Sequence, residues 1–185
     1  PFKHASGFKS VNVSSLEMFH NVLDAALDNN NIETIIVDSF TKLIEILYHE
    51  CKELHSGYEI FNNYNNDIYD LLEKSKSSEK YIIYTGIEDD ITDADGVTRK
   101  FVKVQGNVWK NSIEKEFLIV LFTDNKKTED GIEYRFRTNT SGENSAKSPM
   151  DMFDMFIPND LKYVIDTCKE YYGETKTKQQ TKGVV

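Results

Sequence analysis

The chain has 185 residues, of which 39% are hydrophobic and 12% aromatic, a composition typical of a folded globular protein rather than a disordered one. Its formal net charge of −9 argues against a protein that coats nucleic acid with its whole surface. No apolar run approaches the ~20 residues that a bilayer-spanning helix needs, so we expect a cytoplasmic protein without a membrane partner. Cys51 and Cys168 lie in helical patterns without a CxxC spacing, which predicts buried or partly buried free thiols.

The first elements predict a βαβ unit. A short strand is expected at Val11–Val13, and Ser14 or Ser15 is a natural N-cap for a helix whose apolar residues recur as far as Leu27. A second strand is expected over residues 32–38. Such units are right-handed almost without exception, which places the helix on one face of the sheet.

The second strand carries the first functional candidate. Thr34–Val37 is a short apolar run, followed by Asp38 and by an amphipathic segment from Phe40 to Leu54. This pattern is typical of a strand buried on both faces of a parallel sheet and leading into a helix. Asp38 would then lie at the carboxyl end of the strand, where α/β proteins bind ligands and where a carboxylate can hold Mg²⁺ against a nucleotide phosphate. The alternative is a helix N-cap or turn residue.

A second polar strand end follows. A helix is expected over Tyr58–Lys76, and another apolar strand over Tyr81–Gly86. Because the carboxyl ends of parallel strands meet at one edge of a sheet, Thr85 and Glu88 are predicted to lie beside Asp38.

An acidic stretch comes next, with hairpin arms expected at Ile87–Ile91 and Phe101–Val104. A turn at Asp93–Gly96 explains its carboxylates without a site. The alternative is a metal-dependent nuclease that uses this acidic set: Glu88, Asp89, Asp90, Asp93 and Asp95.

The C-terminal half predicts antiparallel additions to the sheet. A short helix is expected within Trp109–Lys115, and Phe117–Phe122, the most hydrophobic stretch, is expected to be a central strand. Ile132–Thr138 alternates aromatic and basic residues, which indicates an antiparallel edge strand with one solvated face. A last helix is expected over Leu161–Tyr172.

Residues 97–147 are locally basic, with ten Lys and Arg against seven Asp and Glu. Their cations are interleaved with aromatic residues such as Trp109 and Tyr134, a combination that suits binding to a single-stranded nucleic acid. Substituting Arg135 and Arg137 by Ala is then expected to weaken salt-dependent binding. The alternative is a solvated hairpin face.

The order of these motifs resembles phage-encoded RecA-like ATPases, the AAA-type proteins of phage recombination modules. The resemblance runs from about Val11 to Gly173. It is carried by five segments: residues 35–39 (IIVDS), 84–86 (YTG), 104–106 (VQG), 146–149 (AKSP) and 157–161 (IPNDL). It implies an α/β fold with a mostly parallel sheet flanked by helices, over a core of residues 1–173. Residues 174–185 are polar and lack periodicity, which predicts a disordered tail.

The resemblance also implies a function and a site. The function is binding of ATP and Mg²⁺, assembly into a homo-oligomer in the bacterial host cytoplasm, and action on single-stranded DNA in recombination or annealing. Asp38 matches the Walker B acid and metal ligand, Glu88 is the second catalytic candidate, and Ser39, Thr85 and Lys147 are the candidates for nucleotide contact. The candidate DNA-binding residues are Arg99, Lys103, Gln105, Asn107, Arg135 and Arg137.

One motif of that family is absent from the 185 residues. They contain no Gly-x-x-x-x-Gly-Lys-Ser/Thr, the loop whose backbone amides and lysine cradle phosphates. Because the chain starts at Pro1, we expect an upstream segment to carry that strand and loop. A degenerate, non-hydrolysing ATPase or a scaffold protein is the alternative.

Overall fold

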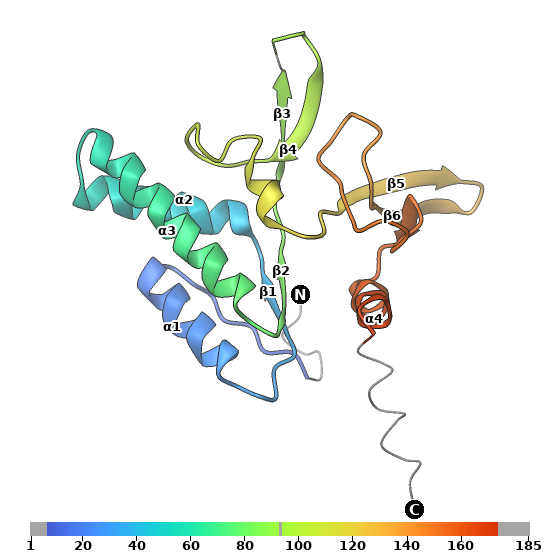
Figure 1. Ribbon diagram of the computed structural model, residues 1–185, viewed down its shortest axis with the longest axis horizontal. Helices are drawn as coiled ribbons and strands as arrows, with labels where there is room; N and C mark the ends of the chain where they lie inside the picture. The colour runs from blue at the N-terminus through green and yellow to red at the C-terminus, as the bar shows by residue number, and fades with distance from the viewer. Residues whose placement is uncertain (1–6, 93, 174–185) are drawn as a thin grey trace, which may run out of the picture. The chain divides into compact units, whose positions relative to one another are not determined.

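The computed structural model describes residues 7–92 and 94–173, which form a mixed α/β structure (Figure 1). Its helices are α1 (Leu16–Leu27), α2 (Phe40–Leu54), α3 (Tyr58–Lys76), α4 (Leu161–Tyr171) and a 3₁₀ turn at Ile113–Glu116. Its strands are β1 (Thr34–Val37), β2 (Tyr81–Tyr84), β3 (Glu88–Thr92), β4 (Thr98–Val102), β5 (Phe122–Thr128), β6 (Gly131–Arg137) and β7 (Phe156–Pro158). The α/β class is confirmed, as are the predicted bounds of α2 and α3.

The chain divides into two compact units. Unit 1 comprises Pro1–Glu88 and Val102–Ser112, and unit 2 comprises Asp89–Phe101 and Ile113–Val185. The predicted tail, residues 174–185, lies outside the described residues.

Unit 1 is built on one parallel strand pair. β1 and β2 pair in register from Thr34 opposite Tyr81 to Val37 opposite Tyr84, so the two strands end level with each other. Parallel pairing is confirmed for these strands, which the α2–α3 pair connects, as parallel strands require.

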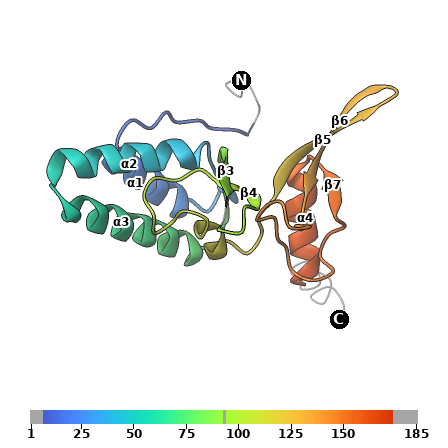
Figure 2. The same ribbon diagram turned by 90° about the horizontal axis from the view of Figure 1, so that it is seen from above.

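The core of unit 1 lies between its helices, which pack side by side (Figures 1 and 2). Their apolar faces recur at helical spacing and become almost fully buried, as Ile44 and Leu47 of α2 and Ile68 and Leu71 of α3 illustrate. Lys74 of α3 forms an ion pair with Asp24 of α1, and Glu50 of α2 accepts a hydrogen bond from the Leu16 amide at the start of α1, at 2.9 Å.

The strands themselves correct one prediction. No residue of β1 or β2 is fully buried, and Ile36 is 38% exposed, although the apolar runs predicted strands covered on both faces. The described part of this sheet contains two strands. An apolar run shows that a strand is suited to burial. It does not show how many strands or helices cover that strand in the fold.

Two further strand predictions are wrong. Val11–Val13 is not a strand, and Phe117–Phe122 contains only the first residue of β5. Before Phe122, this segment forms one isolated bridge in the described structure, between Val120 and Lys147, and Leu118 is 64% exposed. Hydrophobicity alone does not supply the continuous partner strand that a ladder requires.

Unit 2 contains an antiparallel sheet in the order β5-β6-β7. Phe136 of β6 pairs with Ile157 of β7, and both side chains are buried. The tip of the β5–β6 hairpin extends beyond β7 and α4 (Figure 2). Asp160 caps α4 by accepting hydrogen bonds from the Lys162 and Tyr163 amides.

The predictions of free cysteines and of a hairpin are confirmed, but the second arm of the hairpin is Thr98–Val102 and not Phe101–Val104. Cys51 and Cys168 are both buried and free. β3 and β4 pair as the two arms of a hairpin, and the Thr92 and Thr98 hydroxyls lie 2.8 Å apart. None of the helices within residues 7–92 and 94–173 has the length and apolar character that a bilayer crossing needs.

Candidate functional site

Asp38 and Ser39 form the junction between β1 and α2. The Ser39 side chain accepts a hydrogen bond from the Lys42 amide at 3.3 Å, which satisfies one of the amides that an α-helix leaves unpaired at its start. Ser39 is therefore the N-cap of α2. Asp38, one residue earlier, remains exposed beside this helix start.

Thr85 lies against Asp38, as the parallel strands predict. The Thr85 hydroxyl donates a hydrogen bond of 2.5 Å to Oδ1 of Asp38. The backbone fixes the pair, because the Thr85 amide donates to the Val37 carbonyl at 3.1 Å and the Thr85 carbonyl accepts from the Phe40 amide at 2.7 Å. The second carboxylate oxygen of Asp38 has no hydrogen-bond or ion-pair partner within the described part of the chain.

Thr41, in the first turn of α2, was not among the sequence candidates. It is 4% exposed, and its hydroxyl accepts a hydrogen bond from the Ile87 amide at 3.1 Å and donates to the Lys103 carbonyl at 3.4 Å. These partners lie 46 and 62 residues away in sequence. A threonine in the first turn of a helix carries no local signal of such contacts.

The Gln105–Asn107 loop is anchored on α3. The buried Tyr64 hydroxyl donates to the Gln105 carbonyl at 3.0 Å, and burial raises the pKa of Tyr64, which keeps the hydroxyl protonated as a donor. Gly106 adopts a φ of +76°, and a Cβ built there would lie 3.7 Å from the Tyr64 ring. The loop is thus held by its backbone. The Lys103 and Asn107 residues at its two ends are exposed.

The remaining nucleotide-site candidates are Glu88 and Lys147. Glu88 is exposed and is the first residue of β3. Lys147 belongs to unit 2, where its backbone exchanges two hydrogen bonds with Val120, whereas Asp38 belongs to unit 1.

The arginine candidates, all in unit 2, have partners within the protein. Arg135 binds Asp124 through Nε and a terminal guanidinium nitrogen, each at 2.7 Å, and its guanidinium carbon lies 3.7 Å from the Phe156 ring centroid. Arg137 binds Glu143 at 3.0 Å. Arg99 donates to the Gly142 carbonyl at 3.1 Å. The positive charges of Arg135 and Arg137 are therefore already compensated by neighbouring carboxylates.

The acidic hairpin does not assemble a metal centre in the described residues. Asp90 pairs with Lys100 across β3 and β4 at 3.7 Å, and Asp93 lies outside the described part of the chain. Within residues 7–92 and 94–173, no three His, Cys, Asp or Glu side chains are grouped so that they could share an ion.

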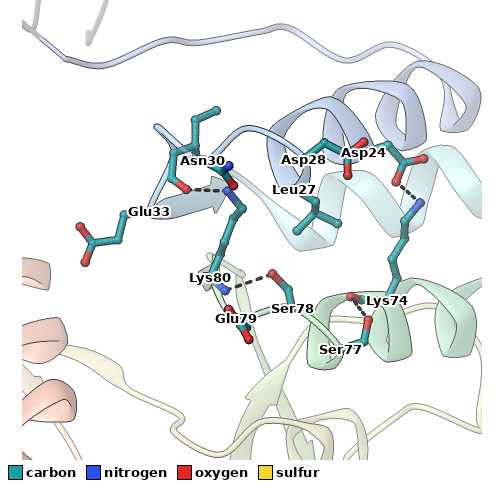
Figure 3. Close-up of a pocket in the computed structure, with 11 residues that line it drawn as sticks. Asp24, Leu27, Asp28, Asn30, Glu33, Lys74, Ser77, Ser78, Glu79 and Lys80 are labelled. Atoms are coloured by element: carbon teal, nitrogen blue, oxygen red, sulfur yellow. Dashed lines mark hydrogen bonds and ion pairs between the residues drawn. The ribbon is translucent and has the colours of Figure 1, made fainter. Parts of the chain in front are cut away.

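A cleft of about 860 Å³ lies at the end of β1 and β2 opposite to Asp38 and Thr85 (Figure 3). It is lined by the segments that precede the two strands, which are four residues and so about 13 Å long. Its lysines are occupied, because Lys80 donates to the Asn29 and Ile32 carbonyls at 2.6 and 2.7 Å and Lys74 pairs with Asp24. Its acids, Asp24, Asp28, Glu33 and Glu79, outnumber these lysines. The cleft is electrostatically unsuited to phosphate.

Comparison with known families identifies the class of protein. A family described as an AAA domain matches residues 2–150, most of the chain. The chain therefore belongs to this AAA domain family of ATPase-like nucleotide-binding domains. No curated protein and no solved structure matches the chain significantly.

Proposed function

We propose that this AAA domain binds ATP with Mg²⁺ at the corner formed by Asp38, Ser39 and Thr85, and that it acts on single-stranded DNA in phage recombination or annealing. The 2.5 Å hydrogen bond between Thr85 and Asp38 carries the nucleotide part of the proposal. It joins the polar ends of two adjacent parallel strands at the edge of the sheet where α/β proteins bind ligands. The family match supports the same activity.

The corner suits a hydrated magnesium ion. Mg²⁺ commonly binds one or two carboxylates together with waters and substrate phosphates, rather than a cage made of protein alone. Asp38 offers one unused, exposed carboxylate oxygen, while Thr85 fixes the other. Asp38 would hold the ion, which would supply charge neutralisation for the phosphates.

The DNA part of the proposal rests on Lys103 and Asn107. They flank a loop of fixed backbone, and the segment from residue 103 to residue 112 contains Lys103 and Lys110 but no acid. Because a polyanion is attracted by local uncompensated charge, this loop is better suited to it than Arg135 and Arg137. RecA-like assembly into a homo-oligomer in the host cytoplasm is part of the same proposal.

The test is Mg²⁺-dependent ATP binding by the full chain, measured by calorimetry. We expect Asp38→Ala to lower the affinity at least about tenfold, which corresponds to about 1.4 kcal/mol. Asp28→Ala, which removes an exposed carboxylate from the cleft at the other end of the sheet, serves as the matched control and should leave the affinity unchanged. Equal affinities for wild type and Asp38→Ala would refute the site.

A non-hydrolysing ATPase or scaffold is the second candidate. It is favoured by the absence from the 185 residues of a Gly-x-x-x-x-Gly-Lys-Ser/Thr loop, which supplies phosphate-binding amides and a lysine. This candidate predicts that the chain binds ATP with Mg²⁺ but releases phosphate no faster than Asp38→Ala. Hydrolysis above that control excludes it.

A further inference from the structure

Thr41 uses both hydrogen-bonding capacities of one buried hydroxyl. The oxygen accepts from the Ile87 amide at 3.1 Å, while its proton points to the Lys103 carbonyl at 3.4 Å, the longer and weaker of the two contacts. Valine has nearly the same shape but can do neither. Thr41 is 4% exposed, and the loss of its hydroxyl leaves the Ile87 amide without this hydrogen-bond partner.

The segments that Thr41 joins approach each other closely. The Lys103 amide donates to the Ile87 carbonyl at 2.7 Å, which closes a ring of three contacts with Thr41. A Cβ on Gly86 would lie 2.5 Å from Cγ2 of Val102 and 3.8 Å from Oγ1 of Thr41. A shift of the exit of β2 relative to α2 is therefore expected to disturb the Lys103 segment.

Each of these segments leads to a candidate binding element. Ile87 follows Thr85 by two residues, and Thr85 holds Asp38 through its hydroxyl and Phe40 through its carbonyl. Lys103 opens the loop that Tyr64 anchors at Gln105. A continuous series of hydrogen bonds and short backbone segments thus links Asp38 to that loop by way of Thr41, all within unit 1.

We propose that Thr41 is a positioning residue. Its hydroxyl holds the Lys103–Asn107 loop against the first turn of α2 and passes a change at the Asp38–Thr85 pair, such as the arrival of ATP with Mg²⁺, to that loop. The transmission rests on the proposed function, whereas the positioning of the loop rests on the contacts alone.

The chain contains a built-in reporter for the test. Trp109 is the only tryptophan, it is buried, and it follows Asn107 by two residues in the same unit. Three variants of the full chain are compared with wild type: Thr41→Val, Thr41→Ser, which keeps the hydroxyl, and Thr123→Val. Thr123 is an exposed residue of β5 whose hydroxyl has no hydrogen-bond partner among the described residues, so it controls for the chemical change itself.

Three quantities are measured: affinity for ATP with Mg²⁺, Trp109 emission during that titration, and amide hydrogen exchange at Ile87 and over residues 103–107. We expect Thr41→Val to raise exchange at Ile87 at least about tenfold and to abolish the emission change. Its ATP affinity should stay within about threefold of wild type, because Thr41 is not one of the three residues proposed to hold the ligand. Thr41→Ser and Thr123→Val should behave as wild type.

Three other outcomes would contradict the positioning role, the transmission or the proposed function, and each can be told from the others. A Thr41→Val chain with wild-type exchange and a full emission change overturns it. A wild-type chain that binds ATP without altering Trp109 emission overturns the transmission. If wild type binds no ATP, the proposed function fails, and the exchange rates alone decide the positioning role.

Discussion

At the scale of single residues, Cys51 illustrates how burial sets the chemistry of a group. It is 5% exposed between α2 and α3, and its Sγ lies 3.7 Å from Oδ2 of Asp67. Burial, with a further contribution from the Asp67 charge, raises the pKa of the Cys51 thiol to about 11. Burial also raises the pKa of Asp67. The thiol therefore stays protonated at neutral pH and acts as a hydrogen-bond donor, not as a nucleophile.

This shift predicts a loss of stability at alkaline pH. The unfolded chain releases the Cys51 proton near pH 9, whereas the native chain keeps it until about pH 11, so rising pH favours unfolding across that window. Between pH 8 and pH 10, wild type should lose about 1 kcal/mol more unfolding free energy than Cys51→Ser, whose hydroxyl does not titrate there. Urea unfolding at the two pH values measures the difference. Parallel losses in the two proteins would contradict the assignment.

Arg135 is a cation that the sequence pattern predicts to be solvated but that binds partners within the protein. Alternation along β6 predicts a solvated basic face, yet the Arg135 guanidinium is paired with Asp124, directly opposite it on β5, and stacked on Phe156 of the next strand. The opposing acid and the aromatic ring come from other parts of the chain. Sequence alternation identifies the face of the strand but not the groups that meet it.

At the scale of secondary-structure elements, the helices follow from local sequence. The bounds of α2 match its amphipathic period, with Ser39 as a capping residue that accepts from the Lys42 amide. The strands are predicted less well from local sequence, because a strand needs a partner strand that its own sequence does not identify. The apolar segment before β5 is the example, since it finds only the Val120–Lys147 bridge.

The close approach between the end of β2 and the end of β4 leads to a prediction about secondary-structure packing. Gly86→Ala introduces a methyl group 2.5 Å from Cγ2 of Val102, so the backbone or the Val102 side chain has to shift. We expect the unfolding free energy to fall by about 1–3 kcal/mol, measured by denaturant unfolding.

The control is a double-mutant cycle with Val102→Ala. Because that substitution removes the clashing atom, Gly86→Ala should cost less in the Val102→Ala background than in wild type. Equal costs in both backgrounds would show that the close approach is not the cause.

At the scale of the whole molecule, charge is distributed unevenly. The chain carries −9 overall, but residues 97–147 are basic and are divided between the two units. In unit 1, Lys103 is exposed at the end of the anchored loop and forms no ion pair with another described residue. In unit 2, carboxylates neutralise Arg135 and Arg137.

This distribution predicts which substitution alters binding of single-stranded DNA. In a salt titration, Lys103→Ala should reduce the slope of log K against log salt by about 0.7, the value for one phosphate contact on a single strand. Lys42→Ala, which removes an exposed lysine paired with Glu45 on α2, should leave the slope unchanged. Arg135→Ala should do the same. Binding that is absent or independent of salt would remove the DNA part of the proposed function.

The amino-acid sequence by itself determined the helices of unit 1 and the meeting of Asp38 with Thr85. Helical period and capping are encoded within a few residues, and the carboxyl ends of adjacent parallel strands must lie at the same edge of their sheet. Only the tertiary structure decided that Thr41 joins β2 to the Lys103 loop and that Arg135 is neutralised. These contacts depend on how distant segments pack, and a spacing of 46 or 62 residues leaves no periodic trace in the sequence.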